Sequence, residues 1–148
     1  MRAAMQEALE RYANFYETLT RESLNELPRF FHKDARFKDP FNDVTGIDKI
    51  RLVFEDMFKT IGQPQFKVID MAWSNAEDGS AFMLWTFKYQ IRGRGLPVTV
   101  NGMSAMILST DGKVRSHIDY WDAAQGLYEH LPVIGTLLRW IRNRVAVK

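Results

Sequence analysis

The sequence predicts an α+β domain in which N-terminal helices enclose a cone-shaped, curved antiparallel sheet around an apolar pocket, with one more helix at the C-terminus. Apolar residues recur at helical spacing before residue 62 and again near the end of the chain, whereas aromatic and β-branched residues fill four segments between them. Short turn sequences join these four segments, as in an antiparallel meander. A chain of 148 residues has room for one domain, which we expect to span residues 1–148.

Two long helices are expected before the sheet. The first covers residues 3–19, where apolar side chains from Met5 to Leu19 follow helical spacing. The other begins with Thr45 as its N-cap and ends at Gly62, which is a typical stop signal.

A short helix and a short strand are expected between them. The short helix is capped by Ser23 or Asn25 and extends to Phe31, and Ser23 with Glu26 fits a capping box. The short strand covers residues 35–38, because the following Asp-Pro pair interrupts it.

The sheet is expected to consist of four long strands that alternate inward-facing and outward-facing side chains. These strands cover residues 65–73, 81–92, 96–109 and 114–121. Helical spacing resumes near residue 131 and predicts a C-terminal amphipathic helix over residues 131–148.

The composition excludes several classes of protein. Apolar residues make up 46% of the chain and charged residues 26%, as in a folded globular domain. A net charge of +2 and the lack of any nucleic-acid motif argue against nucleic-acid binding. The absence of cysteine excludes a disulfide, a thiolate metal site and a cysteine nucleophile. Because the N-terminus has no apolar signal segment, we expect a cytoplasmic protein.

The densest group of polar and aromatic residues lies in the last expected strand. His117, Asp119 and Trp121 share one face of it, and His117 with Asp119 could transfer protons. The same pair could supply two metal ligands, but no further ligand can be placed, so we predict no metal and no other cofactor. The remaining alternative is that the two side chains contact only water or each other.

Two other residues are candidates for catalysis. Asp39 lies among aromatic residues before a proline, where it could serve as a general base or could bind the amide groups of a turn. Tyr16 lies on the core face of the first helix, where it could donate a hydrogen bond to a ligand or to another core group.

Aromatic residues on the strands predict an apolar cavity, although the same periodicity also fits a solid core. If the cavity exists, its occupant is a small apolar molecule. The residues expected to bind it are Phe15, Phe54, Trp85, Phe87, Tyr89, Ser104, Met106 and Trp121.

The C-terminal segment is basic, since no acidic residue follows Glu129. The expected arrangement is that this helix packs its apolar stripe on the domain and keeps its cations near its end. The alternative is contact with an anionic membrane surface, which Trp140 would favour. The cations are Arg139, Arg142, Arg144 and Lys148.

The chain resembles the nuclear transport factor 2-like superfamily from Tyr12 to Leu127, and within it the SnoaL-like branch. The resemblance rests on the order of elements and on two motifs. These are Phe37-Lys38-Asp39-Pro40, followed by Gly46 and its helix, and Asp111-Gly112-Lys113-Val114, which leads into Asp119-Tyr120-Trp121-Asp122. The resemblance implies a cone-shaped barrel with a deep apolar pocket, often dimeric through the sheet, so we expect a homodimer.

Three kinds of relative imply different roles for these residues. Ketosteroid isomerase has its catalytic base in the aspartate-proline setting of Asp39, and its oxyanion-hole tyrosine falls near Phe15 and Tyr16. Its protonated aspartate falls near Ser104 in this sequence. A serine hydroxyl is a weaker donor than a neutral carboxylic acid, which argues against steroid isomerisation. Limonene epoxide hydrolase ends its sheet with a similar run, whose first aspartate takes part in catalysis, so the resemblance makes Asp119 a candidate catalytic residue. Its arginine and second aspartate fall near Phe87 and Tyr89, so we do not expect epoxide hydrolysis.

SnoaL-type polyketide cyclases use an acidic residue for acid-base catalysis in the same cavity, a role that Asp119 with His117 could fill. Two hypotheses follow. One is a cofactor-free isomerase or cyclase that moves a proton next to a carbonyl group. The other is a non-catalytic module that binds an apolar ligand or a protein partner on the same scaffold.

Overall fold

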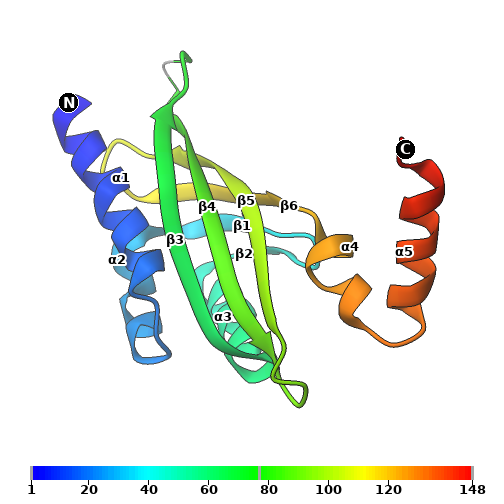
Figure 1. Cartoon of the computed structure of the whole chain (residues 1–148). Helices are drawn as coiled ribbons and strands as arrows, with labels where there is room; N and C mark the ends of the chain where they lie inside the picture. Colours follow the sequence, from blue (N-terminus) through cyan, green and yellow to red (C-terminus); the bar gives the residue numbers. More distant parts are fainter. Residues whose placement is uncertain (1, 77, 148) are drawn as a thin grey trace.

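The computed structural model describes residues 2–76 and 78–147. It confirms the α+β class: helices come first, a curved sheet follows, and a helix ends the chain (Figure 1). The elements are α1 (Arg2–Glu17), η1 (Glu22–Glu26), α2 (Leu27–Phe30), β1 (Phe31–Lys38), β2 (Asp43–Thr45), α3 (Ile47–Thr60), β3 (Ile61–Trp73), β4 (Ser80–Ile91), β5 (Pro97–Leu108), β6 (Val114–Trp121), α4 (Ala123–Gly126), η2 (Tyr128–His130) and α5 (Ile134–Val145).

The described part of the chain forms one sheet with the strand order β2-β1-β6-β5-β4-β3. Strands β3 to β6 form the predicted antiparallel meander. The sheet as a whole is mixed, however, because β1 runs parallel to β6 and places Phe37 opposite His117. Local periodicity could not show this pairing, since the two strands are far apart in the sequence. The parallel pair brings the Phe37-Lys38-Asp39 segment beside the His117-Asp119 segment.

The helices α1 and α3 cover the concave face of the sheet (Figure 1). Strand residues alternate between buried and exposed positions along β4 and β5, as the pleat of a half-covered sheet requires. The buried set includes Leu9 and Tyr12 from α1, Ile50 from α3, and Met83 and Met106 from the sheet. This layer forms the core beneath the candidate site.

Two predicted helix starts are wrong. Ser23 does not pair with Glu26; instead its N–H donates to Thr20 Oγ1 at 3.1 Å, and the Thr20 N–H donates to Ser23 Oγ at 2.9 Å. Thr45 belongs to β2, and the N-cap of α3 is Gly46, whose φ of 97° favours glycine. The first start is therefore held by the paired bonds between Thr20 and Ser23, and the second begins at a glycine.

The C-terminal helix does not pack its apolar stripe on the domain, so that prediction is wrong. α5 stands apart from the sheet and contacts η2 (Figure 1). Leu137 and Trp140 are each 55% exposed, and Val145 is 79% exposed. Arg139 donates to the Glu129 carbonyl and Arg142 binds the Glu129 carboxylate, so the polar side of α5 faces the domain. Among the described helices, none is long and apolar enough to cross a membrane.

Candidate functional site

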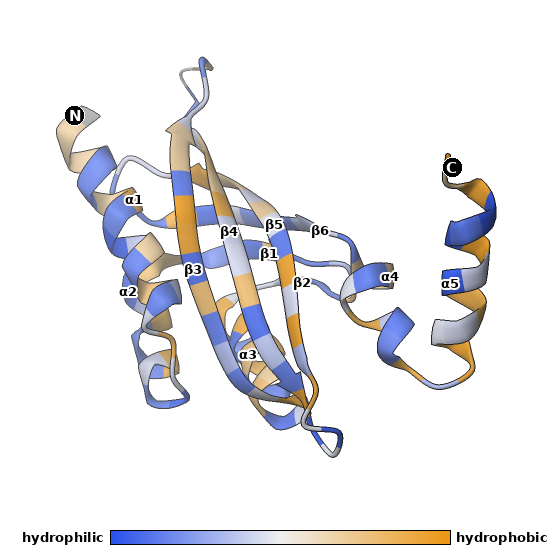
Figure 2. Ribbon diagram, viewed as in Figure 1, coloured by the Kyte–Doolittle hydropathy of each residue, from blue (hydrophilic) through white to orange (hydrophobic). Residues whose placement is uncertain are grey.

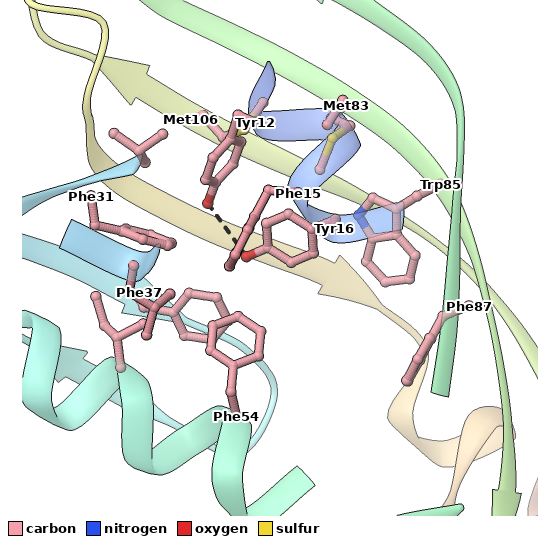
Figure 3. Packing of buried hydrophobic residues seen from close by; sticks show 14 of the residues in the cluster. Tyr12, Phe15, Tyr16, Phe31, Phe37, Phe54, Met83, Trp85, Phe87 and Met106 are labelled. Atoms are coloured by element: carbon pink, nitrogen blue, oxygen red, sulfur yellow. Dashed lines mark hydrogen bonds between the residues drawn. The ribbon is translucent and has the colours of Figure 1, made fainter. Parts of the chain in front are cut away.

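A cavity of about 350 Å³ lies between α3 and the concave face of the sheet. In Figure 3, Phe54 of α3 and Trp85 and Phe87 of β4 point toward the same interior space. The apolar and aromatic lining residues are Tyr16, Phe37, Phe41, Val53, Phe54, Met57, Ile61, Phe66, Trp85, Phe87, Tyr89, Trp121 and Leu127. The other lining residues are Asp39, Asn42, Asp56, Thr60 and Asp119.

A hydrogen-bond network behind the cavity wall converges on Asp119. His117 is completely buried, and its Nε2 lies 2.7 Å from Asp119 Oδ1. The Ser104 hydroxyl donates to the same oxygen at 2.5 Å, and the Trp85 indole N–H donates to Ser104 Oγ at 2.8 Å. Among the described residues, no partner approaches the second oxygen, Oδ2. Since Asp119 lines the cavity, Oδ2 is available to a bound molecule.

The other nitrogen of His117 connects the network to two tyrosines of α1. The Tyr12 hydroxyl lies 2.8 Å from His117 Nδ1. It also lies 3.3 Å from the Tyr16 hydroxyl, a contact that Figure 3 shows as a dashed line. With Asp119 as a carboxylate and His117 neutral, His117 Nε2 carries the proton, so Nδ1 accepts from Tyr12. Tyr12 then accepts from Tyr16. Tyr16 alone of these three lines the cavity, so its hydroxyl can turn from Tyr12 to a ligand.

Aromatic packing fixes the position of the His117 ring. It is stacked between Tyr16, at a centroid distance of 5.4 Å, and Phe37, at 5.0 Å. Burial raises the pKa of the Tyr12 and Tyr16 hydroxyls well above the usual value, and the Asp119 charge raises that of Tyr16 further. Both tyrosines therefore remain hydrogen-bond donors at neutral pH.

Asp39 lines the same cavity, but its carboxylate is already occupied. Asp39 Oδ1 accepts from the backbone N–H groups of Phe41 at 2.8 Å and Asn42 at 2.7 Å. The Asn42 side-chain amide donates to both carboxylate oxygens at 3.1 Å. This is the turn arrangement that the sequence offered as one alternative, and it leaves Asp39 few free lone pairs.

Tyr89 contributes only its ring to the cavity. Its hydroxyl donates to the Gly126 carbonyl, which ties β4 to α4 at the cavity rim. Burial raises the pKa of Tyr89 to about 12, so this bond persists at neutral pH.

The position of Trp85 depends on a glycine opposite it. Gly102 of β5 lies directly across from Trp85, and a Cβ on Gly102 would lie 2.3 Å from the indole ring. The indole thus lies across the neighbouring strand, where its N–H reaches Ser104.

We expect Gly102→Ala to displace Trp85 and to lower the free energy of unfolding by about 1–3 kcal/mol, because a packed ring cannot yield without repacking. Urea unfolding followed by tryptophan fluorescence measures this loss. Gly62→Ala is the matched control, since a Cβ there would meet only atoms at 3.8 Å and beyond. Equal stability of the two variants would contradict the prediction.

Most of the predicted site residues gather around the cavity. Asp119, Asp39 and Tyr16 line it. The predicted ligand-binding residues that line it are Phe54, Trp85, Phe87, Tyr89 and Trp121.

The other predicted residues lie behind the described cavity wall. His117 and Ser104 reach the cavity through Asp119. Phe15 packs on Phe30 at a centroid distance of 4.5 Å, and Met106 is 1% exposed in the core. The strand alternation that suggested Met106 is correct, but the cavity occupies only part of the concave face.

Sequence reasoning missed several residues of the site. Helical spacing places Tyr12 on the core face of the first helix without indicating a role at the site, and Phe37 is predicted only as part of a motif. Phe66 stacks on Phe87 at 4.1 Å and lines the cavity, which the alternation along β3 could have indicated. Asp56 and Asn42 lie at positions where no sequence pattern distinguishes them from surface residues.

The geometry argues against the metal-ligand alternative for His117. Both of its ring nitrogens are engaged, one by Tyr12 and one by Asp119. Across residues 2–76 and 78–147, no group of three or more His, Asp or Glu side chains is placed to hold a metal ion.

Solved structures of other proteins share this fold. A Shewanella putrefaciens protein assigned as a SnoaL-like polyketide cyclase matches with a TM-score of 0.67 and 16% identity, over 82% of this chain and 92% of that one. An epoxide hydrolase from M. tuberculosis, described as similar to limonene epoxide hydrolase, matches with a TM-score of 0.65 and 14% identity, over 97% and 95%.

A protein from Catenulispora acidiphila with a ketosteroid isomerase-like fold matches with a TM-score of 0.69 and 15% identity, over 82% of this chain and 89% of that one. At these identities the likeness shows the fold alone. No curated protein matches the sequence. The sequence model of the SnoaL-like domain family matches residues 12–117. Because that match includes most of the chain, the protein belongs to the SnoaL-like domain family, which has the nuclear transport factor 2-like fold.

Proposed function

We propose that the protein binds a small apolar carbonyl compound in its cavity and catalyses a cofactor-free proton transfer of the isomerase or cyclase type. The observation that carries the proposal is the arrangement around Asp119: two donors hold Oδ1, while Oδ2 has no described partner in an apolar cavity. A carboxylate held in this way is oriented for proton transfer without giving up its reactive oxygen.

The proposed chemistry has two components. Asp119 Oδ2 takes a proton from the carbon next to the carbonyl group, and the electron pair of that C–H bond moves into an enolate. Tyr16 donates a hydrogen bond to the enolate oxygen, because its raised pKa keeps the hydroxyl protonated. For isomerisation, Asp119 then returns the proton to another carbon. For cyclisation, the enolate carbon attacks a second carbonyl group of the same molecule, and Asp119 gives its proton to the alkoxide that forms.

The lining suits a substrate with little polarity. Stacked and edge-to-face rings from α1, α3, β3 and β4 line the wall, so an apolar molecule is buried among them. By resemblance to limonene epoxide hydrolase, Phe87 and Tyr89 fall near the positions of the arginine and the second aspartate that epoxide hydrolysis requires. Enolate chemistry requires neither of these residues.

The test uses the full chain with cyclohexanone, 2-tetralone and progesterone as probes. Ligand binding is followed by tryptophan fluorescence, because Trp85 and Trp121 line the cavity. Exchange of the hydrogens next to the carbonyl is followed by NMR in D₂O. We expect saturable binding of at least one ketone and exchange above the buffer rate. The proposal is overturned if none of the three ketones binds and none exchanges these hydrogens faster than in buffer.

A non-catalytic binding module is the second candidate. One observation favours it: Asp39, another carboxylate at the cavity, is occupied by its own turn, so it cannot act as the acid or base partner of Asp119. Saturable ketone binding with exchange no faster than in buffer would support this module and contradict the enzyme.

We also propose that the protein is a homodimer formed through the outer face of the sheet. Six neighbouring side chains form what we call the outer patch: Phe82 and Leu84 of β4, Met103 and Ala105 of β5, and Ile118 and Tyr120 of β6. Tyr120 is 60% exposed, and Met103 and Leu84 are 43% and 40% exposed. A continuous apolar patch of this kind is typical of an interface, and its lack of charge suits a second copy.

Leu84→Arg should convert the dimer to a monomer, because it places a charge in the middle of the outer patch. Sedimentation velocity at micromolar concentration measures the change. Leu52→Arg is the matched control, since Leu52 is exposed on α3 rather than on the sheet. A wild-type protein that sediments as a monomer would contradict the dimer.

The cytoplasmic location stays a prediction from the sequence.

A further inference from the structure

We propose that α5 binds the surface of a membrane that contains anionic lipid. This inference does not rest on the proposed reaction, because it concerns a different surface of the protein. It rests on three features of α5: an uncovered apolar stripe, a purely basic set of charges and a separation from the rest of the domain.

The apolar stripe follows helical spacing for the whole length of α5. Ile134, Leu137, Ile141 and Val145 recur at intervals of three and four residues, so they share one face of the helix. Their exposed fractions are 50%, 55%, 43% and 79%, and Trp140 beside them is 55% exposed. In Figure 2, α5 stands away from the rest of the fold, and apolar and polar residues alternate along it. A stripe of this size would be buried if α5 were an ordinary core helix.

The charges of α5 are all positive. Arg139, Arg142 and Arg144 are its charged residues, and the chain contains no acid after Glu129. Arg142 binds the Glu129 carboxylate, whereas Arg144 lies over the Trp140 ring at 5.0 Å. Arginine beside tryptophan at the edge of an apolar stripe suits the level of lipid headgroups, where the ring meets the acyl boundary and the cation meets phosphate.

These features favour a lipid surface over a second copy of the chain. The outer patch of the sheet contains no acid, and Lys88 is the charged residue that β4 and β5 contribute. A basic helix would meet like charge there. An anionic bilayer can bury the apolar stripe of α5 and also supplies the negative charge that attracts its arginines. With 12 residues, α5 would lie in the membrane surface and not cross it.

The position of α5 also relates the membrane to the cavity. Leu127 lines the cavity shortly before α5 begins, and Phe41 at the rim contacts Tyr128 of η2 at a centroid distance of 6.0 Å. α5 packs on η2, so a membrane-bound α5 brings this rim close to the lipid surface. An apolar ligand could then reach the cavity with little passage through water.

The test is vesicle flotation of the full-length protein. One set of vesicles contains phosphatidylcholine with phosphatidylglycerol, and the other contains phosphatidylcholine alone. We expect the protein to float with the anionic vesicles, and added salt to release it. Leu137→Glu should weaken the partition at least tenfold, because it replaces a leucine that enters the bilayer with a charged side chain. Arg144→Gln should weaken it about fivefold.

Leu52→Glu is the matched control, since Leu52 is also 55% exposed but lies on α3. It should float as the wild-type protein does. Equal flotation of wild-type protein with neutral and anionic vesicles, or no effect of Leu137→Glu, would overturn the proposal. A change of oligomeric state in Leu137→Glu without lipid would also overturn it, because α5 would then be an interface between copies.

Discussion

Asp119→Asn should lower the rate of ketone hydrogen exchange by about 100-fold or more, while the affinity for the ketone changes only a few-fold. The reason is that an amide has the shape of the carboxylate but cannot accept the proton. Ser104 and His117 still have an oxygen to bond, so the side chain keeps its place. Exchange rates by NMR and affinities by tryptophan fluorescence separate the two effects.

Asp39→Asn is the matched control for that experiment. Its carboxylate lines the same cavity but is occupied by the N–H groups of Phe41 and Asn42. We expect exchange within a few-fold of the wild-type rate and a modest loss of stability from the weaker turn. If Asp39→Asn abolishes exchange and Asp119→Asn does not, the roles assigned to the two acids are reversed.

The two acids also show what sequence reasoning can reach. The sequence identified Asp39 and Asp119 as candidates because each stands in a polar-aromatic motif. It could not rank them, because the ranking depends on hydrogen bonds. The donors to Asp39 are the N–H groups of residues two and three positions later in the chain. The sequence could therefore suggest the turn arrangement as an alternative. The donor Ser104 comes from a neighbouring strand, and its pairing with Asp119 is visible only in the folded sheet.

The fold was predictable where the pattern is local. The meander of β3 to β6 appears close to the predicted bounds, because aromatic and β-branched alternation and turn sequences define each strand. The parallel pairing of β1 with β6 was not predictable from such patterns, since the pairing joins Phe37 and His117 across most of the chain. That pairing builds the Tyr16-His117-Phe37 stack, so the least local feature of the fold determines the candidate site.

The C-terminal helix illustrates a different failure. Helical spacing predicted its existence correctly, but an amphipathic helix does not specify what its apolar face contacts. In the structure the bonds from Arg139 and Arg142 to Glu129 orient α5 through its polar side. A stripe that looks like a core face in the sequence is therefore exposed.

His117→Leu should lower the free energy of unfolding by about 2–5 kcal/mol, a large part of the total for a domain of this size. Leucine fills much of the space but removes both hydrogen bonds of a fully buried ring. The Tyr12 hydroxyl loses its acceptor and Asp119 loses a donor. Urea unfolding measures the loss as a shift of the midpoint at constant slope. His32→Leu, at a half-buried position of β1, should cost much less.

A double-mutant cycle with Tyr12→Phe shows whether the loss comes from the network or from packing. In the wild-type background Tyr12→Phe should cost about 1 kcal/mol, because His117 Nδ1 loses its donor. In the His117→Leu background the same change removes a hydroxyl that has lost its best acceptor, so its cost should fall to zero or change sign. A coupling energy of about 1 kcal/mol or more would follow. Additive effects would mean that Tyr12 and His117 are not hydrogen-bonded in solution, and the orientation of Asp119 would then need another explanation.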